Sequence, residues 1–295
     1  MKKALAPALH RLALLTGASA AKARALKIGR ILSFHGVGDK IYPAANFESH
    51  LRYLTRHFSV VSFATLLERI NSPQGLTNEI ALTFDDGLRN NFTTAYPLLK
   101  KFNVPATFFV CPGLIENGRW LWTHEVRARL ALLAEPNIEQ VLTEMKALGL
   151  KERTAAEDDL RRRTASFKPT EAQRHRYDLM SWDEVRQLDP ALISIGSHSL
   201  THPILSTLTG VELAVEIAES RRMLENRLQR AVEFFCYPNG SHNPEVVRLA
   251  AVNYRAAVTT EAGFVRPGCD LHQLPRIGIT PGLAHLAWRL HRPGA

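Results

Sequence analysis

The stretch Glu79-Ile-Ala-Leu-Thr-Phe-Asp-Asp-Gly87 decides the fold of this 295-residue chain. Its first six residues are mostly apolar and partly β-branched, so they predict a buried strand that ends at two adjacent acids and a glycine. Gly87 permits a turn in which both carboxylates approach one cavity. Two aspartates are poorly suited to a hydrophobic core, so we expect Asp85 and Asp86 to belong to a polar site at the end of this strand.

A second segment downstream repeats this design. Residues 191–196 (Ala-Leu-Ile-Ser-Ile-Gly) predict another strand, and Ser-His-Ser-Leu-Thr-His-Pro follows at residues 197–203 with two imidazoles four residues apart. If this stretch turns helically, His198 and His202 share one face. With one aspartate they form the two-histidine, one-carboxylate set of catalytic zinc sites, which leaves positions open for water and substrate. The other aspartate is then free to act as a base.

Each motif alone also has an ordinary explanation. A pair of acids after a strand is common where a solvated loop begins, and two histidines four residues apart often occur by chance. The combination is more specific, because each motif follows a strand and the ligand types complement one another. The two motifs together therefore predict a metal site.

The same motifs resemble those of a known family, the polysaccharide deacetylases of carbohydrate esterase family four, in the branch with Tyr-His-x-Val and Tyr-Pro-x-Gly motifs. Further matching segments run from about residue 31 to residue 279: Ile31-Leu-Ser-Phe-His-Gly-Val37, Pro105-Ala-Thr-Phe-Phe-Val110, Met180-Ser-Trp-Asp-Glu184, Phe235-Cys-Tyr-Pro-Asn-Gly240 and Leu274-Pro-Arg-Ile277. The resemblance implies an α/β fold, a distorted (β/α) barrel. It also implies a divalent metal, usually zinc, and hydrolysis of N-acetyl or O-acetyl groups on a sugar polymer or glycolipid.

The resemblance implies a role for each matching residue. Asp86, His198 and His202 match the metal ligands, and Asp85 matches the catalytic base. The segment from Tyr237 to Gly240 matches the substrate-binding motif that supplies a backbone N–H to the tetrahedral oxyanion, with Asn239 at the matching position. A Tyr-Pro-Asn-Gly sequence is also an ordinary turn, which is the alternative for this segment.

One departure from the family pattern concerns the partner of the base. Many members carry an arginine where this chain has Cys236, and that arginine pairs with the base aspartate. Arg276, near the start of a late predicted strand, is our candidate replacement, because a guanidinium can hold a carboxylate through two hydrogen bonds. The alternative for Arg276 is a surface or structural ion pair.

A second departure concerns the general acid, which many relatives place in a Leu-x-His segment. The segment Leu283-Ala-His285 matches this motif, but its sequence predicts the start of a terminal helix. His35, at the end of the first predicted strand, is the favoured catalytic candidate, and His272 in a polar loop is another. A solvated or satisfied histidine is the alternative for each.

The composition agrees with a single barrel-sized domain. The chain is 45% hydrophobic and 22% charged, and it contains no run of eighteen apolar residues. Three scattered cysteines predict free thiols, which favours a reducing compartment and a cytoplasmic location. Residues 1–30 predict an amphipathic segment that can touch an anionic membrane. They also have the outline of a weak export signal, which is the alternative.

Residues 31–295 then form the catalytic domain, with a helical insertion at about residues 114–179. Trp120 and Trp122 at its start either stack on sugar rings or pack the insertion on the barrel. The formal net charge of +9 does not predict nucleic acid binding, because the basic residues are dispersed among predicted helices. The leading hypothesis is a bacterial metal-dependent deacetylase acting on an acetylated glycan or glycolipid. Hydrolysis of another C–N bond and a catalytically silent carbohydrate-binding protein are the alternatives.

Overall fold

Seven parallel strands form a closed barrel in the computed structural model, which describes residues 2–294, with side chains from residue 6 onward. The barrel closes where β1 (Arg30–Phe34) pairs with both β3 (Glu79–Phe84) and β8 (Leu274–Gly278). The other strands are β2 (Ser59–Val60), β4 (Ala106–Val110), β5 (Ile193–Ser197), β6 (Phe234–Cys236) and β7 (Ala256–Ala262). Around the ring they run β1-β8-β7-β6-β5-β4-β3, with the short β2 beside the start of β3. This arrangement confirms the predicted distorted (β/α) barrel.

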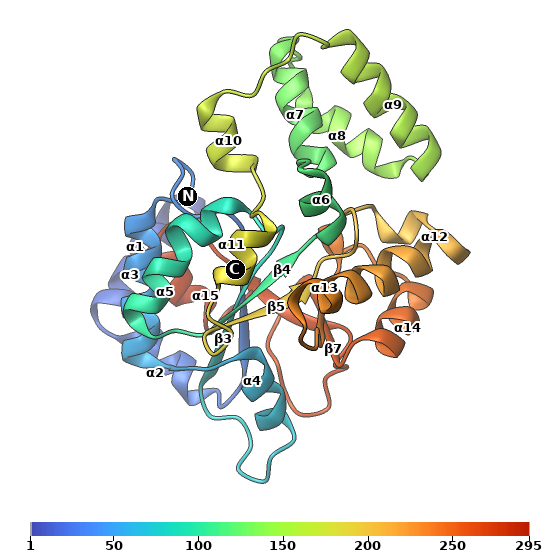
Figure 1. Ribbon diagram of the computed structural model, residues 1–295. Helices are drawn as coiled ribbons and strands as arrows, with labels where there is room; N and C mark the ends of the chain where they lie inside the picture. The colour runs from blue at the N-terminus through green and yellow to red at the C-terminus, as the bar shows by residue number, and fades with distance from the viewer. Residues whose placement is uncertain (1, 295) are drawn as a thin grey trace.

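Helices surround the barrel because parallel neighbours need a crossover between them (Figure 1). These helices are α3 (Ala44–His57), α4 (Phe63–Ile70), α5 (Tyr96–Phe102), α11 (Trp182–Gln187), α12 (Gly210–Ala214), α13 (Ser220–Leu228), α14 (Pro244–Asn253) and α15 (Leu283–Arg289). The apolar residues at 47–54 and 61–70 have helical spacing, which predicts two outer helices, and both form as α3 and α4. Ser181 and Glu184 have the spacing of a capping box, and this box forms at the start of α11, where each side chain accepts a hydrogen bond from the other residue's backbone N–H.

The strands divide their apolar side chains between two buried clusters. Leu82 of β3 belongs to the cluster that includes α3 and α5, whereas its neighbour Ala81 belongs to a second cluster with Phe109 and the apolar face of α4. Successive strand residues point to opposite faces, so one cluster lies under the outer helices and the other inside the barrel. Both faces of the strands are therefore buried, as parallel sheets require.

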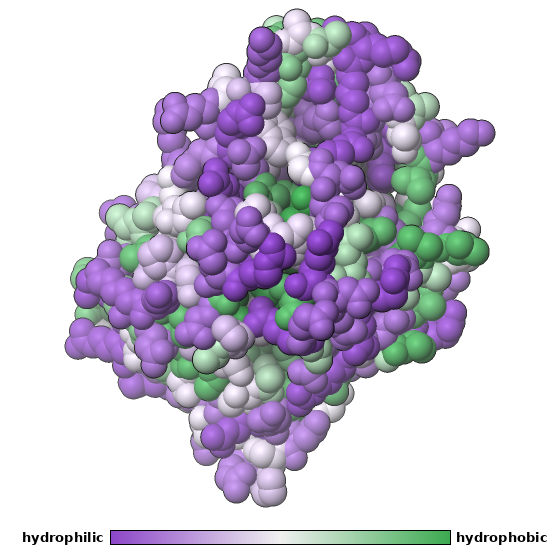
Figure 2. All heavy atoms as spheres, viewed as in Figure 1, coloured by the Kyte–Doolittle hydropathy of each residue, from purple (hydrophilic) through white to green (hydrophobic). Residues whose placement is uncertain are grey.

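Between β4 and α11, where the sequence predicts an insertion, the chain forms five helices. They are α6 (Pro112–Asn117), α7 (Trp122–Leu132), α8 (Ile138–Ala147), α9 (Leu150–Arg163) and α10 (Glu171–Tyr177). Figure 1 shows α7, α8 and α9 standing above the barrel, and Figure 2 shows hydrophilic residues over most of them. A small core of their own includes Trp122, Leu142 and Leu160 together with Ile204, which follows β5. The insertion is thus packed onto the loop that carries the two predicted histidine ligands.

The N-terminal segment forms two helices, α1 (Lys2–Leu15) and α2 (Ala18–Ala25). Helix α1 packs on α15, where the His10 ring stacks on His285 at a centroid distance of 5.3 Å. In the described part of the chain, no helix combines the length and the apolar character that a membrane crossing needs.

Candidate active site

The predicted site residues gather at one end of the barrel because each follows the carboxyl end of a strand. His35 follows β1, Asp85 and Asp86 follow β3, and His198 follows β5. Parallel strands in a closed barrel direct these ends to a common rim. Residues far apart in the sequence therefore meet at this rim.

The backbone separates the two aspartates by a sharp turn. Asp86 and Gly87 both have left-handed backbone conformations, with φ of 74° and 69°. This conformation is uncommon for a residue other than glycine. Before the turn, the Asp85 N–H donates to the carbonyl of Phe34 at 2.9 Å, which continues the β1–β3 pairing. Asp85 thus stays in the barrel interior, while Asp86 enters the loop above it.

The three predicted metal ligands converge. The Oδ1 atom of Asp86 lies 3.5 Å from Nε2 of His198 and 3.5 Å from Nε2 of His202. A tetrahedral zinc ion with ligand bonds of about 2.0–2.1 Å keeps its ligand atoms about 3.4 Å apart. All three side chains are buried, and their donor atoms lie within 4.8 Å of one another. The donor set and its spacing therefore fit a small divalent cation.

Both histidines direct Nε2 toward Asp86. The Nδ1 atom of His198 lies 2.7 Å from the carbonyl oxygen of Cys236, so Nδ1 carries a proton. Burial alone would lower the pKa of His198, but its contacts with Cys236 and Asp86 outweigh burial and raise the pKa, so a cation would have to displace the Nε2 proton. Burial lowers the pKa of His202 to about 3, so its imidazole is neutral. The indole N–H of Trp122 donates to the His202 carbonyl at 3.2 Å. Trp122 is 5% exposed, so it packs the insertion against the metal loop instead of offering a face to a sugar.

The conditional expectation of a helical turn between the histidines is wrong. Ser199 and His202 have φ of 63° and 61°, and the segment is an irregular loop. The Ser199 hydroxyl accepts a hydrogen bond from the His202 N–H at 3.0 Å and holds the loop closed. The two rings still approach each other, with centroids 4.8 Å apart.

A second group, Asp85, His198 and Cys236, also has donor atoms within 4.8 Å. It suits a cation less well. Burial raises the pKa of the Cys236 thiol, so the sulfur keeps its proton. Both carboxylate oxygens of Asp85 are already engaged by Arg276. The Asp86 set is therefore the better metal site.

Arg276 contacts Asp85 inside the barrel. Its Nη1 and Nη2 atoms donate to Oδ1 and Oδ2 of Asp85, both at 2.7 Å, and its Nε donates to the carbonyl of Thr259 at 2.7 Å. Nη2 also lies 3.3 Å from the sulfur of Cys236. Arg276 is 1% exposed, so the pair is not on the surface. Burial alone would raise the pKa of Asp85, but the guanidinium outweighs it and holds the pKa below its usual range.

Of the three predicted acid candidates, His35 lines the cavity beside the metal ligands. Its side chain is 60% exposed, and its Nε2 lies 3.9 Å from Oδ2 of Asp85. His272 instead bonds the carbonyl of Tyr254 at 2.9 Å, and His285 stacks on α1. The structure brings only the first of these three histidines to the site.

The predicted substrate-binding segment lies at the same rim. Tyr237 and Asn239 line the cavity that contains the metal ligands. The Tyr237 hydroxyl donates to the carbonyl of His272 at 2.8 Å, and Asn239 and Gly240 have φ of 54° and 70°. A Cβ atom on Gly240 would lie 2.0 Å from Oγ1 of Thr260, so only glycine fits there. This close approach holds Asn239 at the cavity wall.

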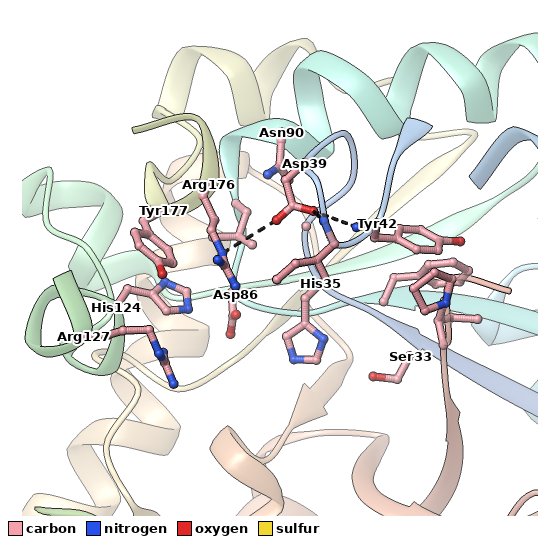
Figure 3. Close-up of a pocket in the computed structure, with 16 residues that line it drawn as sticks. Ser33, His35, Asp39, Tyr42, Asp86, Asn90, His124, Arg127, Arg176 and Tyr177 are labelled. Atoms are coloured by element: carbon pink, nitrogen blue, oxygen red, sulfur yellow. Dashed lines mark hydrogen bonds and ion pairs between the residues drawn. The ribbon is translucent and has the colours of Figure 1, made fainter. Parts of the chain in front are cut away.

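His124 is a site residue that the sequence did not reveal. It lies on α7, and its ring stacks on Tyr177 at 4.6 Å. Figure 3 shows His124 and Arg127 on one side of Asp86 and His35 on the other. Burial lowers the pKa of His124 to about 4, so its imidazole is neutral near neutral pH. The nearby tryptophans mark where the insertion begins, but no motif spacing links this histidine to the barrel.

Two adjoining cavities open at this site. One has a volume of about 300 Å³ and the other about 200 Å³, and four residues line both: His35, Asp86, His124 and Arg127. Volumes of this order are typical of sites for small molecules. The metal ligands and Asp85 line the smaller cavity, and the larger one extends from Asp86 along β1.

Comparisons with known proteins find relatives of similar sequence and fold. YxkH of Bacillus subtilis (strain 168), which carries a polysaccharide deacetylase name, is 23% identical over 269 residues, covering 88% of this chain and 74% of its own. The Streptococcus pyogenes deacetylase PplD has the same fold, with a TM-score of 0.64 at 20% identity over 91% of this chain and 98% of its own. IcaB from Ammonifex degensii gives 0.63 at 19% identity over 88% and 97%.

The family model for polysaccharide deacetylases matches residues 74–257, which include β3 with its two aspartates, the histidine loop and β6. This match spans more than half of the chain. The chain therefore belongs to the polysaccharide deacetylase family.

Proposed function

We propose that the protein is a metal-dependent deacetylase that removes acetyl groups from an N-acetylated saccharide or polysaccharide, with zinc as the cation. The observation that carries the proposal is that two neighbouring carboxylates, those of Asp85 and Asp86, have different partners. Asp86 converges with His198 and His202, whereas Asp85 is held by Arg276 with its oxygens at 2.7 Å from the guanidinium nitrogens. One carboxylate is thus available to a metal and the other to a proton.

A divalent cation held by Asp86, His198 and His202 would polarise the acetyl carbonyl and acidify water. Asp85 accepts the proton of the water that attacks the carbonyl carbon. Its low pKa keeps it ionised, and the two hydrogen bonds from Arg276 fix the direction of its carboxylate. Arg276 is therefore a positioning residue that acts through the base.

The remaining roles follow from what lines the cavity. Asn239, on the left-handed turn after β6, supplies hydrogen-bond donors at the wall where the oxyanion develops. His35 is the proposed proton donor to the leaving amine, because it is exposed to the cavity and 3.9 Å from Asp85. His124 is neutral and better suited to hydrogen-bond a sugar hydroxyl.

The ion pair inside the barrel also weighs against a silent carbohydrate-binding protein. Burying two charges costs several kcal/mol of desolvation for each ion, so a module that only binds sugar gains nothing from Asp85 and Arg276. Hydrolysis of another non-peptide C–N bond would use the same residues and differs only in the substrate.

Acetate release tests this proposal. The purified protein is incubated with N-acetylated oligosaccharides, an O-acetylated xylan, a formamide and a cyclic imide; acetate, formate and opening of the imide ring are followed, and bound metal is measured in parallel. We expect acetate from the N-acetylated oligosaccharides, with about one metal ion per chain. Hydrolysis of the imide or formamide alone would favour the other C–N chemistry, and no hydrolysis with metal bound would favour the silent protein.

We also propose that α1 rests on an anionic membrane from the cytoplasmic side. Leu9, Leu12 and Leu15 share one face of this helix and are 51%, 59% and 84% exposed. Arg11 and Lys22 are exposed nearby, and the three cysteines are free thiols.

Sedimentation with lipid vesicles tests the membrane contact. The protein should sediment with phosphatidylglycerol vesicles and not with phosphatidylcholine vesicles, and Leu12→Asp should weaken that binding. Equal sedimentation of the variant and the wild type would rule out this helix as the contact.

A further inference from the structure

The acidic residues that line the two cavities are all engaged. Asp85 is paired with Arg276, and Asp86 faces the two histidine ligands. Asp39, in the larger cavity, accepts hydrogen bonds from the N–H groups of residues 41 and 42, both at 2.8 Å, and lies 3.7 Å from Arg176. With a divalent cation held by Asp86 and the two histidines, as proposed above, none of these carboxylates leaves an uncompensated negative charge for a cationic substrate.

Two further cations reach the cavities from the insertion. Arg127 of α7 lines both cavities, and Lys146 of α8 lines the smaller one together with the metal ligands. Lys146 forms no ion pair with any residue that the structure describes. Arg127 donates to Glu139 at 3.0 and 2.9 Å, but the Glu139 side chain is 77% exposed. An exposed pair of this kind contributes little to stability, so Arg127 can exchange that partner for a ligand at small cost.

The excess of positive charge therefore lies next to the place where the acetyl group must bind. A guanidinium and an ammonium are the groups that proteins use to hold phosphates and carboxylates. Both come from the insertion and not from the barrel, so they belong to the part of the chain that is added to the catalytic scaffold. Such additions on a barrel rim are where substrate selectivity resides.

We propose that Arg127 and Lys146 bind an anionic group, a phosphate or a carboxylate, on the acetylated saccharide. This inference rests on the deacetylase function proposed above and names the substrate class of the same site. A neutral saccharide is the alternative that the experiment must separate from it.

The first test compares three small probes that differ in charge. N-acetylglucosamine is neutral, N-acetylmuramic acid adds a carboxylate, and N-acetylglucosamine 1-phosphate adds a phosphate. We expect kcat/KM for acetate release to be about 10-fold higher, or more, for at least one anionic probe than for the neutral one. The preferred anionic probe then distinguishes phosphate from carboxylate.

The second test asks whether these two side chains produce the preference. Arg127→Met and Lys146→Met should each lower the ratio of anionic to neutral kcat/KM by about 10-fold, mainly through KM. The matched controls Arg162→Met and Lys151→Met, from exposed positions on α9 of the same insertion, should keep the wild-type ratio. Unchanged ratios in both test variants would overturn the assignment and leave the deacetylase proposal intact.

A binding measurement separates the two proposals fully. Calorimetry on the metal-loaded Asp85→Asn protein measures the affinity for each probe without turnover. Adding Lys146→Met to this variant should lower the affinity for the anionic probe by about 10-fold. If this loss occurs while the wild type releases no acetate, the anion site stands and the deacetylase proposal fails. Equal affinities for neutral and anionic probes, with and without Lys146, would overturn the anion site.

Discussion

Asp85 and Asp86 are chemically identical neighbours in different surroundings. The turn at Asp86, with φ of 74°, directs the second carboxylate to two imidazoles, while the first remains against Arg276 in the barrel interior. Burial, which usually makes a carboxylate harder to ionise, is offset for Asp85 by a contacting guanidinium. Each aspartate can therefore be tested separately.

Asp85→Asn should retain metal and lose most turnover. An amide keeps the shape of the side chain but cannot accept the proton, and loss of a general base costs about 10²–10⁴ in rate. Acetate release and metal content, measured on the same sample, check this. Asp183→Asn, at an exposed carboxylate on α11, is the control and should behave as the wild type. Normal turnover in Asp85→Asn would show that another group is the base.

Arg276→Met should move the acidic limb of the kcat/KM profile to higher pH. The wild-type guanidinium lowers the pKa of Asp85, so the base stays ionised down to low pH. Without it, burial raises that pKa, and the carboxylate becomes protonated earlier as the pH falls. A pH series of acetate release measures the limb. An unmoved limb would contradict the positioning role of Arg276.

The same variant should lose stability, because a buried carboxylate without its partner costs about 3–5 kcal/mol. Arg276→Lys, which keeps a charge but not the two-pronged geometry, provides a second variant in case the first fails to fold. Arg266→Met, at an exposed arginine in the segment between β7 and β8, is the control. It should change neither the acidic limb of the pH profile nor the free energy of unfolding.

At the scale of elements, Arg30 joins the first strand to the two ends of the chain. This fully buried arginine donates from Nε to the carbonyl of Leu290 at 2.6 Å and from its terminal nitrogens to the carbonyls of Ile28 and Ala23. Burial lowers its pKa to about 10, so it remains charged near neutral pH. Helix α2 and the end of α15 are thereby attached to β1.

Arg30→Met should lower the free energy of unfolding by about 3–5 kcal/mol. Methionine fills part of the space but removes the arginine's hydrogen bonds to three carbonyls, of which that of Ala23 keeps a longer bond from the Leu26 N–H; each loss that leaves a buried carbonyl unpaired costs about 1–3 kcal/mol. Urea unfolding measures the change. The control is Arg52→Met, whose side chain is 62% exposed on α3, and it should stay within about 0.5 kcal/mol of the wild type. If Arg30→Met also stayed within about 0.5 kcal/mol of the wild type, water molecules would be supplying the hydrogen bonds that the arginine donates.

At the scale of the whole molecule, the three proposed metal ligands connect loops that follow different strands. Asp86 comes after β3, and His198 and His202 come after β5, with the insertion packed on the same loop through Trp122. A cation that binds only the folded chain therefore stabilises the barrel rim and the base of the insertion together.

Chelation should consequently lower the melting temperature of the metal-loaded protein. Occupancy at about 100 times Kd adds about 2.7 kcal/mol of stability, which is lost with the ion. His198→Ala should bind little metal and show no response to the chelator, whereas His175→Ala, at an exposed position on α10, should respond like the wild type. Thermal unfolding with and without chelator measures this, and full metal binding by His198→Ala would exclude the proposed triad.

Local patterns in the sequence were enough to predict the outer helices α3 and α4 and the ends of β3 and β5 where the aspartates and histidines lie, whereas the barrel was implied by the family resemblance. They succeed because strand burial, glycine turns and helix caps depend on residues close together in the chain. The same reliance on neighbouring residues explains why the helical turn predicted between His198 and His202 is wrong. Four-residue spacing suits a helix, but packing against Trp122 and the turn at Ser199 produce a loop instead.

By itself, then, the sequence determined the fold class, the family resemblance and the residue types of a metal site with a neighbouring base. Only the tertiary structure decided that Arg276, 191 positions from Asp85, contacts that carboxylate, where the sequence had left a surface or structural ion pair as the alternative. It alone brought His124, Arg127 and Lys146 to the cavities. The physical reason is that barrel closure and the docking of the insertion create contacts between distant segments, which no spacing along the chain encodes.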